Sequence, residues 1–389
     1  MRASTIIYPV PELLPDPRAR FIQLINTCHA LAVAGLKVKI LAGFKNGHSR
    51  ESIIGFYGLS DNTNLEIIKL PMLRMEGLFR FSWHGMFYCS LLLYLLGNIS
   101  KQKQVIIFLR HLKLAAFILK LKKVLNVPMI FEVHEIFHLS TGSPDNQEKT
   151  KRLECLVYNN ANVVISISGA ILDYLYREGI FTGHAHVISD GVRKKWFSAG
   201  KELPGSYICY TGGLYLWKGV DILVKAMRYL PDERLVLVGG GSRLEELKGL
   251  ALAEGVSDRV TFTGIVPHDS VPDYLSDAKV AVLPNIPDGP SEFSSPLKLF
   301  EYMACGVPVV ASAIPAFSEI ISHKKNALLF EPANARALAG CIRELLDNPE
   351  MAATLAEAAR EEVKKYTYEK RAEKIAEVIE TINAVGCGR

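Results

Sequence analysis

The sequence predicts an α/β fold built from two doubly wound, Rossmann-like domains. Short apolar or β-branched runs alternate with longer helical patterns, which is typical of parallel sheets covered by helices. The alternation restarts after a stretch rich in Gly and Pro at 198–205. A chain of 389 residues, 49% of them hydrophobic, has room for two cores and is not disordered. We therefore predict domains over 1–199 and 200–367.

Each predicted domain contains a series of strands. In the first domain they are expected at 4–9, 37–42, 65–69, 104–109, 128–133, 163–167 and 185–188. In the second they are expected at 206–211, 234–239, 259–263, 279–283, 307–311 and 327–330. Helical patterns separate most of them, and a last helix at about 368–389 could pack back on the first domain. Ligands of such sheets bind at the carboxyl ends of the strands, so we expect the two domains to face each other across a binding cleft.

The formal net charge of +5 hides a difference between the two halves. Residues 1–200 contain 24 Lys and Arg against 14 Asp and Glu, whereas residues 201–389 contain 21 against 26. The basic half indicates an anionic partner, for which a phosphorylated substrate, a membrane surface and a nucleic acid are the candidates.

The cysteines and the apolar segments indicate the compartment. Seven cysteines without a C-x-x-C pair favour a reducing compartment over a disulfide framework. The amino terminus runs directly into a predicted strand, so we expect no signal peptide. The uncharged segment 81–100 is interrupted by polar residues, and its continuous apolar part is too short to span a bilayer. It favours a buried helix, with a membrane-surface contact as the alternative.

The segment 210–221 leaves a predicted strand and enters a predicted helix. Gly212 and Gly213 allow a ligand to approach the backbone closely. Lys218 lies near the start of the helix, where unpaired N–H groups favour an anion. The pattern indicates a phosphate-binding lysine, and the alternative is a solvated lysine in a turn.

A second junction of strand, glycines and helix contains Gly239 and Gly240, followed by Ser242 as a candidate N-cap. These glycines could contact a phosphate or a ribose. Taken alone the pattern is weak, because glycine turns often serve only the geometry of the connection.

A third junction, richer in polar residues, leads from Ser295 into a helix. Ser295 is the expected N-cap and Pro296 the first helical residue, which leaves the N–H groups of Leu297 and Lys298 available to an anion. A cation in the first turn, such as Lys298, interacts unfavourably with the helix dipole. Its presence there therefore suggests that it binds an anionic ligand. Glu301 lies one turn later on the same side and could accept the hydroxyls of a ribose. The alternative is a Lys–Glu surface pair.

The sequence from His134 to His138 spells H-E-x-x-H, but we reject a zinc-protease site there. That motif needs a helix, whereas His134 ends the predicted strand at 128–133. A histidine at the carboxyl end of a strand, beside Glu132 and Glu135, is better interpreted as a polar residue of the cleft, or as a structural histidine.

The loop after the first strand is rich in proline and poor in glycine. Asp16 and Pro17 are the expected N-cap and first residue of a helix. Arg18 and Arg20 then lie in its first turn, on the side of the predicted acceptor. They are either ligands of an anionic group or exposed side chains.

Taken together, these motifs resemble the family-4 retaining glycosyltransferases, which have the two-domain GT-B fold. The resemblance covers nearly the whole chain and is strongest over about 206–331. Its elements are YTGGL and KGVD at 210–221, VGGG at 238–241, VTFTGIVP at 260–267, AVLP at 281–284 and EYMACGVPVVAS at 301–312. The first half resembles the family through NTCHALA at 26–32, Gly35, FEVHE at 131–135 and ISDGV at 188–192.

The resemblance implies roles for individual residues. Lys218 matches a lysine that binds the donor diphosphate, and Glu301 matches a glutamate that binds the ribose. His134 matches a histidine near the transferred sugar, and Val266 matches a backbone contact to the base.

The sequence departs from the family pattern at three places. Gly213 stands where the family often has arginine, and Lys298, in a Ser-Pro-x-Lys-x-x-Glu variant, is expected to replace it. Phe293 stands at the position of the first glutamate, with Glu292 one residue away. The proline- and arginine-rich loop replaces a glycine loop.

These interpretations lead to one expected function. We expect a retaining glycosyltransferase that moves a sugar from a nucleotide diphosphate sugar to a glycan or lipid-linked acceptor, without metal or other cofactor. Such an enzyme fits cell-envelope polysaccharide synthesis in the cytoplasm, at the inner face of the membrane. A sugar-nucleotide 2-epimerase of the same fold and a non-catalytic nucleotide-sugar-binding protein are the alternatives. Nucleic-acid binding is not expected, because no basic and aromatic platform is found.

Overall fold

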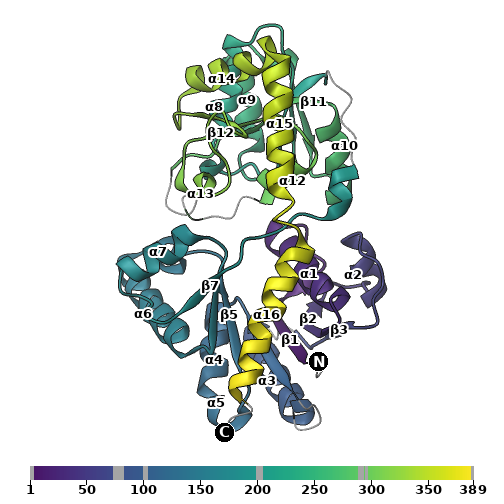
Figure 1. The fold of residues 1–389 in the computed structure, drawn as a ribbon, viewed down its shortest axis with the longest axis vertical. Helices are drawn as coiled ribbons and strands as arrows, with labels where there is room; N and C mark the ends of the chain where they lie inside the picture. The colour runs from purple at the N-terminus through teal and green to yellow at the C-terminus, as the bar shows by residue number, and fades with distance from the viewer. Residues whose placement is uncertain are drawn as a thin grey trace, which may run out of the picture. The chain divides into compact units, whose positions relative to one another are not determined.

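A computed structural model of the chain describes residues 4–72, 83–99, 104–198, 205–287, 293 and 297–386. The chain forms two compact units, drawn in Figure 1. The first unit contains residues 1–189 and 368–389, and the second contains residues 190–367. The first unit thus ends ten residues before the predicted boundary at 199, because the intervening segment packs in the second unit. There, Val192 N–H donates to the carbonyl of Tyr366 (2.8 Å), and Trp196 is a core residue.

The first unit is built on a seven-stranded sheet in the order β3-β2-β1-β4-β5-β6-β7, in which every pairing is parallel. Its strands are β1 (Thr5–Leu14), β2 (Lys37–Phe44), β3 (Leu65–Lys69), β4 (Val105–Leu109), β5 (Met129–Val133), β6 (Val163–Ser166) and β7 (Ala185–Val187). Its helices are α1 (Ala19–Val33), α2 (Arg50–Phe56), α3 (Trp83–Asn98), α4 (Leu112–Lys120), α5 (Lys122–Leu125), α6 (Pro144–Asn160), α7 (Gly169–Arg177) and α16 (Tyr368–Gly386).

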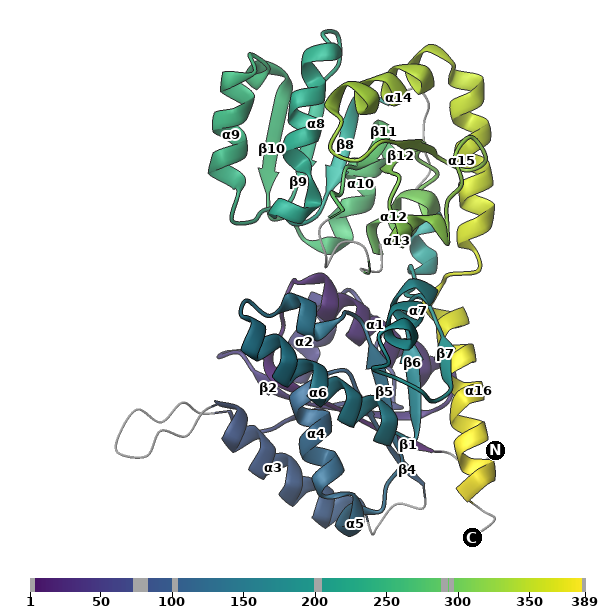
Figure 2. The ribbon, with the colours of Figure 1, turned by 90° about the vertical axis from the view of Figure 1, so that its left-hand side faces the viewer.

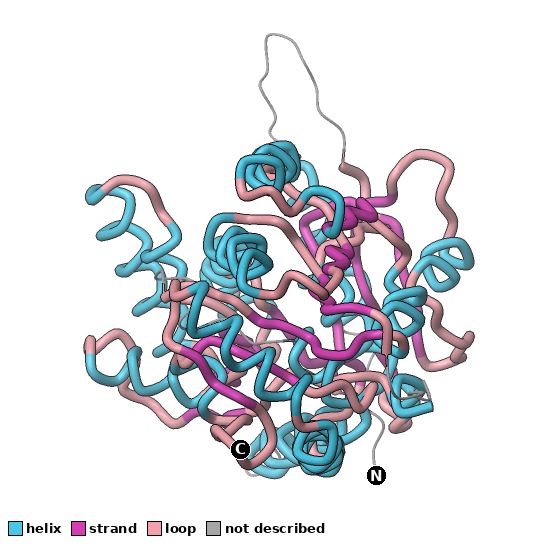
Figure 3. Tube along the Cα trace, turned by 90° about the horizontal axis from the view of Figure 1, so that it is seen from above, coloured by secondary structure: helices cyan, strands magenta, loops and turns pink. Residues whose placement is uncertain are grey.

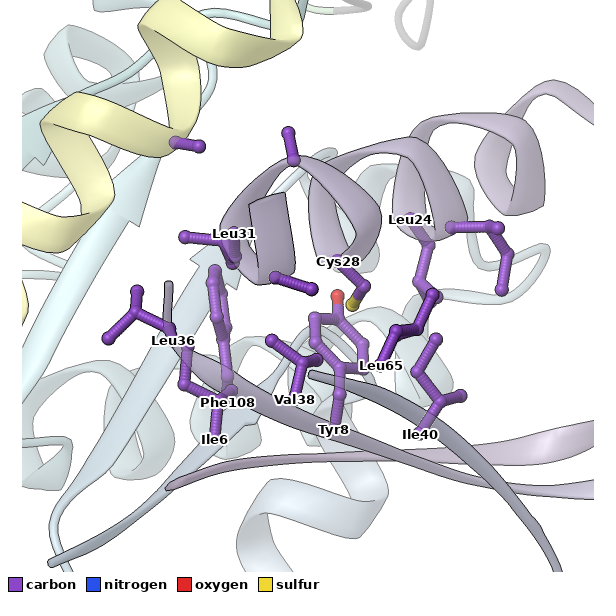
Figure 4. Close-up of a cluster of buried hydrophobic side chains, with 14 of the residues drawn as sticks. Ile6, Tyr8, Leu24, Cys28, Leu31, Leu36, Val38, Ile40, Leu65 and Phe108 are labelled. Atoms are coloured by element: carbon purple, nitrogen blue, oxygen red, sulfur yellow. The ribbon is translucent and has the colours of Figure 1, made fainter. Parts of the chain in front are cut away.

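Helices cover both faces of this sheet. On one face, side chains of α1, α2 and the C-terminal helix α16 pack with alternate residues of the central strands. Figure 4 shows part of this core, in which Tyr8 and Phe108 of the sheet lie under Cys28 and Leu31 of α1. On the other face, α6 packs through Tyr158 against Phe131 of β5, with ring centroids 5.4 Å apart.

The second unit is built on a six-stranded parallel sheet in the order β10-β9-β8-β11-β12-β13. Its strands are β8 (Tyr207–Thr211), β9 (Leu235–Val238), β10 (Val260–Gly264), β11 (Ala278–Leu283), β12 (Val309–Ser312) and β13 (Leu328–Phe330). Its α-helices are α8 (Val220–Ala226), α9 (Leu244–Ala253), α10 (Val271–Ser276), α12 (Leu297–Ala304), α13 (Pro315–Ser318), α14 (Ala335–Asp347) and α15 (Pro349–Val363). One core contains α8, α9 and α14, and the other contains α10 and α12. These helices are labelled in Figure 2, and Figure 3 distinguishes helices from strands by colour.

The predicted alternation of strands and helices is confirmed in both units, and two details of the first strand are corrected. The strand β1 continues to Leu14, through the segment that the prolines predicted to be a loop. The helix α1 begins at Ala19 rather than Pro17, with Arg18 as its N-cap residue. Asp16 does not cap the helix, because its carboxylate accepts the backbone N–H of Arg18 in a turn before it (2.9 Å).

The apolar segment predicted as a buried helix is α3. Phe87, Leu91 and Leu95 of this helix are fully buried, whereas Leu93 and Leu96 on its outer side are 72% and 48% exposed. Within the described residues, no helix combines the length and the apolar character that crossing a membrane requires.

Candidate active site

In each sheet the order in which the strands follow one another along the chain reverses at one point. The predicted site residues lie near these two points. In the first unit the point lies between β1 and β4, and in the second it lies between β8 and β11. Ligands of open α/β sheets bind at such a point, outside the carboxyl ends of the strands.

The glycines after β8 and β9 bring two loops of the second unit together. Gly212 and Gly239 have φ angles of 121° and 138°, in the region that favours glycine. A Cβ atom on Gly239 would lie 2.1 Å from the carbonyl oxygen of Gly212, so the loops can touch only because residue 239 lacks a side chain. A Cβ atom on Gly240 would likewise lie too close to the side chain of Ile265. The structure therefore gives these glycines a packing role, and their predicted role in donor binding remains a prediction.

Gly213, which stands at the family's arginine position, faces an aromatic ring. A Cβ atom on Gly213 would clash with the ring of Tyr215, which stacks on Trp217 with centroids 5.1 Å apart and planes at 9°. An arginine at this position would have to displace Tyr215. The structure thus provides a steric reason for glycine here.

Lys218 and Lys298 lie close together beside these glycines. Lys298, in the first turn of α12, donates to the hydroxyl of Tyr210 (2.8 Å), and its Nζ lies 4.0 Å from the centroid of that ring. Its Nζ also lies where a side chain on Gly212 would be. The hydroxyl of Tyr210 in turn donates to the carbonyl of Gly213 (2.8 Å), so the glycine loop and the lysine are held by the same ring.

The electrostatics of this lysine pair favour an anion. Burial lowers the pKa of Lys218 to about 8. Burial and then the charge of Lys218 lower the pKa of Lys298 well below its usual range, although Glu301 opposes this effect. Neither lysine forms an ion pair with a carboxylate of the described residues. Two desolvated cations near each other are unfavourable unless an anion joins them.

Glu301 also lies in α12, but it does not pair with Lys298. Its Oε1 accepts from His268 Nε2 at 2.7 Å, and Nδ1 of the same histidine contacts Arg193 Nη2 at 3.2 Å. Arg193 and Lys195 both pair with Asp269. The alternative of a Lys–Glu surface pair is therefore wrong, and the predicted ribose-binding carboxylate has a histidine partner instead.

Two residues of this region were missed in the sequence. His268 follows the matched GIVP motif, near the partly buried Val266, but nothing in the local pattern links it to Glu301. Asn285 follows β11 at the point where the strand order of the second sheet reverses; it is 3% exposed and its Oδ1 has no hydrogen-bond partner within the described part of the chain. A buried, unpaired amide oxygen at this place is suited to a ligand donor.

In the first unit, His134 directly follows β5, as predicted. Its Nε2 lies 2.5 Å from Oε2 of Glu132, a buried residue of that strand. The other carboxylate oxygen of Glu132 pairs with Arg371 of α16. Glu135 instead accepts from the hydroxyl of Ser140 (3.2 Å). The sequence thus indicated Glu132, but not Arg371.

The H-E-x-x-H segment is not a helix that presents two histidines on one face. β5 ends before His134, and His138 lies in a 3₁₀ turn over Phe137–Ser140. His138 has its own buried carboxylate, with 2.6 Å between Nδ1 and Oε2 of Glu154. The described residues contain no cluster of three or more His, Cys, Asp or Glu that could hold a metal ion.

Arg18 and Arg20 lie half-exposed at the start of α1, both over the ring of Phe21. Arg18 pairs with Asp16 (2.7 Å), and both arginines pair with Glu12. Their role toward an acceptor remains a prediction.

Several predicted residues lie outside the described part of the chain. They are Glu292, Ser295 and Pro296. Leu297, also predicted to contact the donor, is the first residue of α12 and is half-buried.

Comparisons with known proteins relate the chain to glycosyltransferases. Residues 192–362 match the family model described as glycosyl transferases group 1. The chain is 32% identical over 174 residues to an uncharacterized glycosyltransferase of Haemophilus influenzae, covering 43% of this chain and 47% of that protein. It is 35% identical over 150 residues to a GDP-mannose-dependent alpha-(1-6)-phosphatidylinositol monomannoside mannosyltransferase of Mycobacterium tuberculosis, covering 37% and 39%. The matched part thus spans less than half of either relative.

Solved structures share the fold over nearly the whole chain. A sucrose-phosphate synthase of Thermosynechococcus elongatus superposes with a TM-score of 0.80 at 23% identity, covering 99% of this chain and 100% of that one. Anabaena HepE, solved in complex with UDP-glucose, superposes with a TM-score of 0.75 at 18% identity, covering 97% and 99%. The fold class is therefore GT-B. The resemblance to the group 1 glycosyltransferases is confirmed over 192–362, and the family-4 subclass remains a prediction.

Proposed function

We propose that the protein is a retaining glycosyltransferase that takes a sugar from a nucleotide diphosphate sugar and needs no metal. The observation that carries this proposal is the pair Lys218 and Lys298, two desolvated lysines without a carboxylate partner within the described residues. A diphosphate supplies the missing negative charge, and it gains charge further as it leaves the sugar. Groups that stabilise such growing charge accelerate the reaction.

The remaining residues of the second unit fit the same donor. Glu301 offers its second oxygen to the hydroxyls of a ribose, while His268 holds the first. The amide of Asn285 and the backbone after Gly212 lie at the carboxyl ends of the two central strands. In the proposed reaction the bond from the anomeric carbon to the diphosphate breaks, and the acceptor oxygen forms a bond on the same face. The proton of the acceptor hydroxyl passes to the departing phosphate.

The proposal is tested by two substitutions and a matched control. Lys218→Ala and Glu301→Ala should each reduce transfer below detection while the protein remains folded. Lys248→Ala, which removes an exposed lysine of the same unit, should leave transfer unchanged. Full activity in either site variant would falsify the assignment, and loss of activity with excess chelator would contradict the metal-free reaction.

The donor is best identified by thermal shift with nucleotides and nucleotide sugars. Uridine and guanosine derivatives come first, because HepE was solved with UDP-glucose and the mycobacterial relative is named as GDP-mannose-dependent. Product formed without an acceptor would favour the epimerase alternative. Binding with neither transfer nor donor hydrolysis would favour a non-catalytic binding protein.

For the acceptor we propose a glycan or lipid-linked molecule that is reached at the inner face of the cytoplasmic membrane. The outer side of α3 exposes Leu93 and Leu96, and α4 packs beside it through the stacked rings of Tyr88 and Phe117 (5.0 Å). Exposed lysines follow on α4 and α5, at Lys113, Lys120, Lys122 and Lys123. An apolar helix face beside lysines fits an anionic bilayer surface.

Sedimentation with anionic vesicles at low salt tests the membrane contact. Wild type should bind such vesicles, and a Leu93→Ser/Leu96→Ser variant should bind them less. Binding that is absent in wild type, or equal in the variant, would remove this part of the proposal.

A further inference from the structure

We propose that Arg371, on the C-terminal helix α16, is a positioning residue that fixes the orientation and the protonated nitrogen of His134 through Glu132. All three residues belong to the first unit. The inference deepens the proposed function, on which it rests only for its activity measurement.

The side chain of Arg371 is 2% exposed and is surrounded by acceptors. Its Nε donates to the hydroxyl of Thr27 in α1 (3.1 Å), and one Nη donates to the carbonyls of Ile188 and Ser189 (both 2.6 Å). Its other Nη pairs with Oε1 of Glu132. A planar guanidinium with this many partners has little freedom to move.

Glu132 transmits this order to His134. The carboxylate is 1% exposed, and its two oxygens have different partners: Oε1 pairs with Arg371 and Oε2 lies 2.5 Å from Nε2 of His134. A carboxylate that pairs with a buried guanidinium is ionised and can only accept hydrogen bonds. Nε2 of His134 must therefore carry a proton, and its hydrogen bond to Glu132 fixes the orientation of the ring.

The apolar packing of α16 on the first unit does not require Arg371. Ala372, Ile375, Val378 and Ile379 of α16 already lie in the core with α1 and the sheet. A buried ion pair adds little stability over apolar residues of the same size, so we attribute this pair to the order that it imposes on its neighbours. Here the ordered group is a histidine at the carboxyl end of a central strand.

The protonation of His134 is measured directly in the full-length wild type. Two-bond ¹H–¹⁵N spectra distinguish the ring nitrogens, and the His134 signals are assigned by their loss in His134→Asn. We expect Nε2 to carry the proton at neutral pH. A ring protonated only at Nδ1 would overturn the inference without any activity measurement, so this result is independent of whether the protein transfers a sugar.

Activity measurements use a double variant that removes both buried charges. Arg371→Met/Glu132→Leu replaces the ion pair by apolar side chains, and its melting temperature should remain close to that of wild type. The value of kcat/KM should nevertheless fall roughly 10- to 100-fold, as when outer partners of functional histidines are lost. Lys374→Met, which removes an exposed charge of the same helix, is the matched control and should match wild type in both measurements.

A double-mutant cycle distinguishes positioning from a general structural effect. In the His134→Asn background, the Arg371→Met/Glu132→Leu change should reduce kcat/KM no further than about twofold. An equal loss with and without His134 would show that the pair acts by another route. Wild-type activity together with a wild-type His134 spectrum in the double variant would also overturn the proposal.

Discussion

The two units contain triads of the same residue types in different orders. The first-unit triad runs from Arg371 through Glu132 to His134, and its carboxylate lies in the middle. The second-unit triad runs from Arg193 through His268 to Glu301, and its histidine lies in the middle. The side chains at the two ends, His134 and Glu301, are 18% and 14% exposed.

The order decides both what each triad offers to a ligand and how much the fold depends on it. The first-unit triad presents an imidazole, and the second presents a carboxylate. The middle carboxylate is 1% exposed and needs its arginine, whereas the middle histidine is 25% exposed to water. We therefore expect single substitutions that leave a buried charge unpaired in the first-unit triad to reduce stability, and substitutions in the second triad to reduce donor binding.

The largest difference is expected when each arginine is removed. Arg371→Met leaves Glu132 buried without its cation, and the free energy of unfolding should fall by about 3–5 kcal/mol. Arg193→Met leaves Asp269 42% exposed to water, and the loss should be about 1 kcal/mol. Urea unfolding monitored by circular dichroism measures both values. Equal losses would show that the difference in burial has no energetic meaning.

A smaller difference is expected when each carboxylate becomes an amide. Glu132→Gln should reduce the free energy of unfolding by about 2–3 kcal/mol, because Arg371 loses its ionised partner. Glu301→Gln should change it by less than about 1 kcal/mol but weaken donor binding roughly tenfold or more, since hydrogen bonds to charged groups are the stronger ones. Calorimetry with the nucleotide found by thermal shift provides the affinities. The reverse pattern, with Glu301→Gln the less stable protein, would contradict the comparison.

The sequence was sufficient to predict the ends of both triads and to indicate Glu132, but not Arg371, His268 or Arg193. His134 and Glu301 lie in local patterns, one at a strand end and one in the first turns of a helix, and such patterns reflect backbone geometry. Arg371 is separated from Glu132 by 239 residues, and the contact depends on the return of α16 to the first unit. His268, in a turn after β10, reaches Glu301 of α12 across 33 residues. Contacts of this kind have no signature in a single sequence.

The fold was predicted more completely than the site for the same reason. Strand positions follow from runs of apolar residues, as in VVIS of β6, and these runs are local. The exception was β1, where prolines suggested a loop and the strand nevertheless continues to Leu14 beside β2. The role of the glycines was also ambiguous in the sequence. The sequence suggested that Gly239 contacts a ligand, and the structure shows that it packs against the backbone of Gly212.

Removal of the middle histidine should affect donor binding specifically. His268→Ala deletes the hydrogen bond that holds Glu301, and the KM for the donor should rise roughly tenfold with kcat changed less than about threefold. His268→Gln keeps a donor at this place and should recover part of the loss. A fall in kcat with an unchanged KM would indicate that His268 acts in the chemical step and not through the ribose site.

The smallest effect concerns pH and the lysine pair beside the second-unit triad. Burial lowers the pKa of Lys218 from 10.5 to about 8. The unfolded chain therefore binds more protons than the folded one between these values, and the free energy of unfolding should rise with pH across this window. A bound diphosphate favours the protonated lysine, so the titration of Lys218 should lower donor affinity as the pH rises above about 8, by at most tenfold per pH unit for this lysine, with proton uptake on binding. Calorimetry in buffers of different ionisation enthalpy measures the uptake. Lys218→Met should reduce the slope and Lys248→Met should keep it, whereas a wild-type affinity that stays constant to pH 9.5 would mean that Lys218 does not contact the anion.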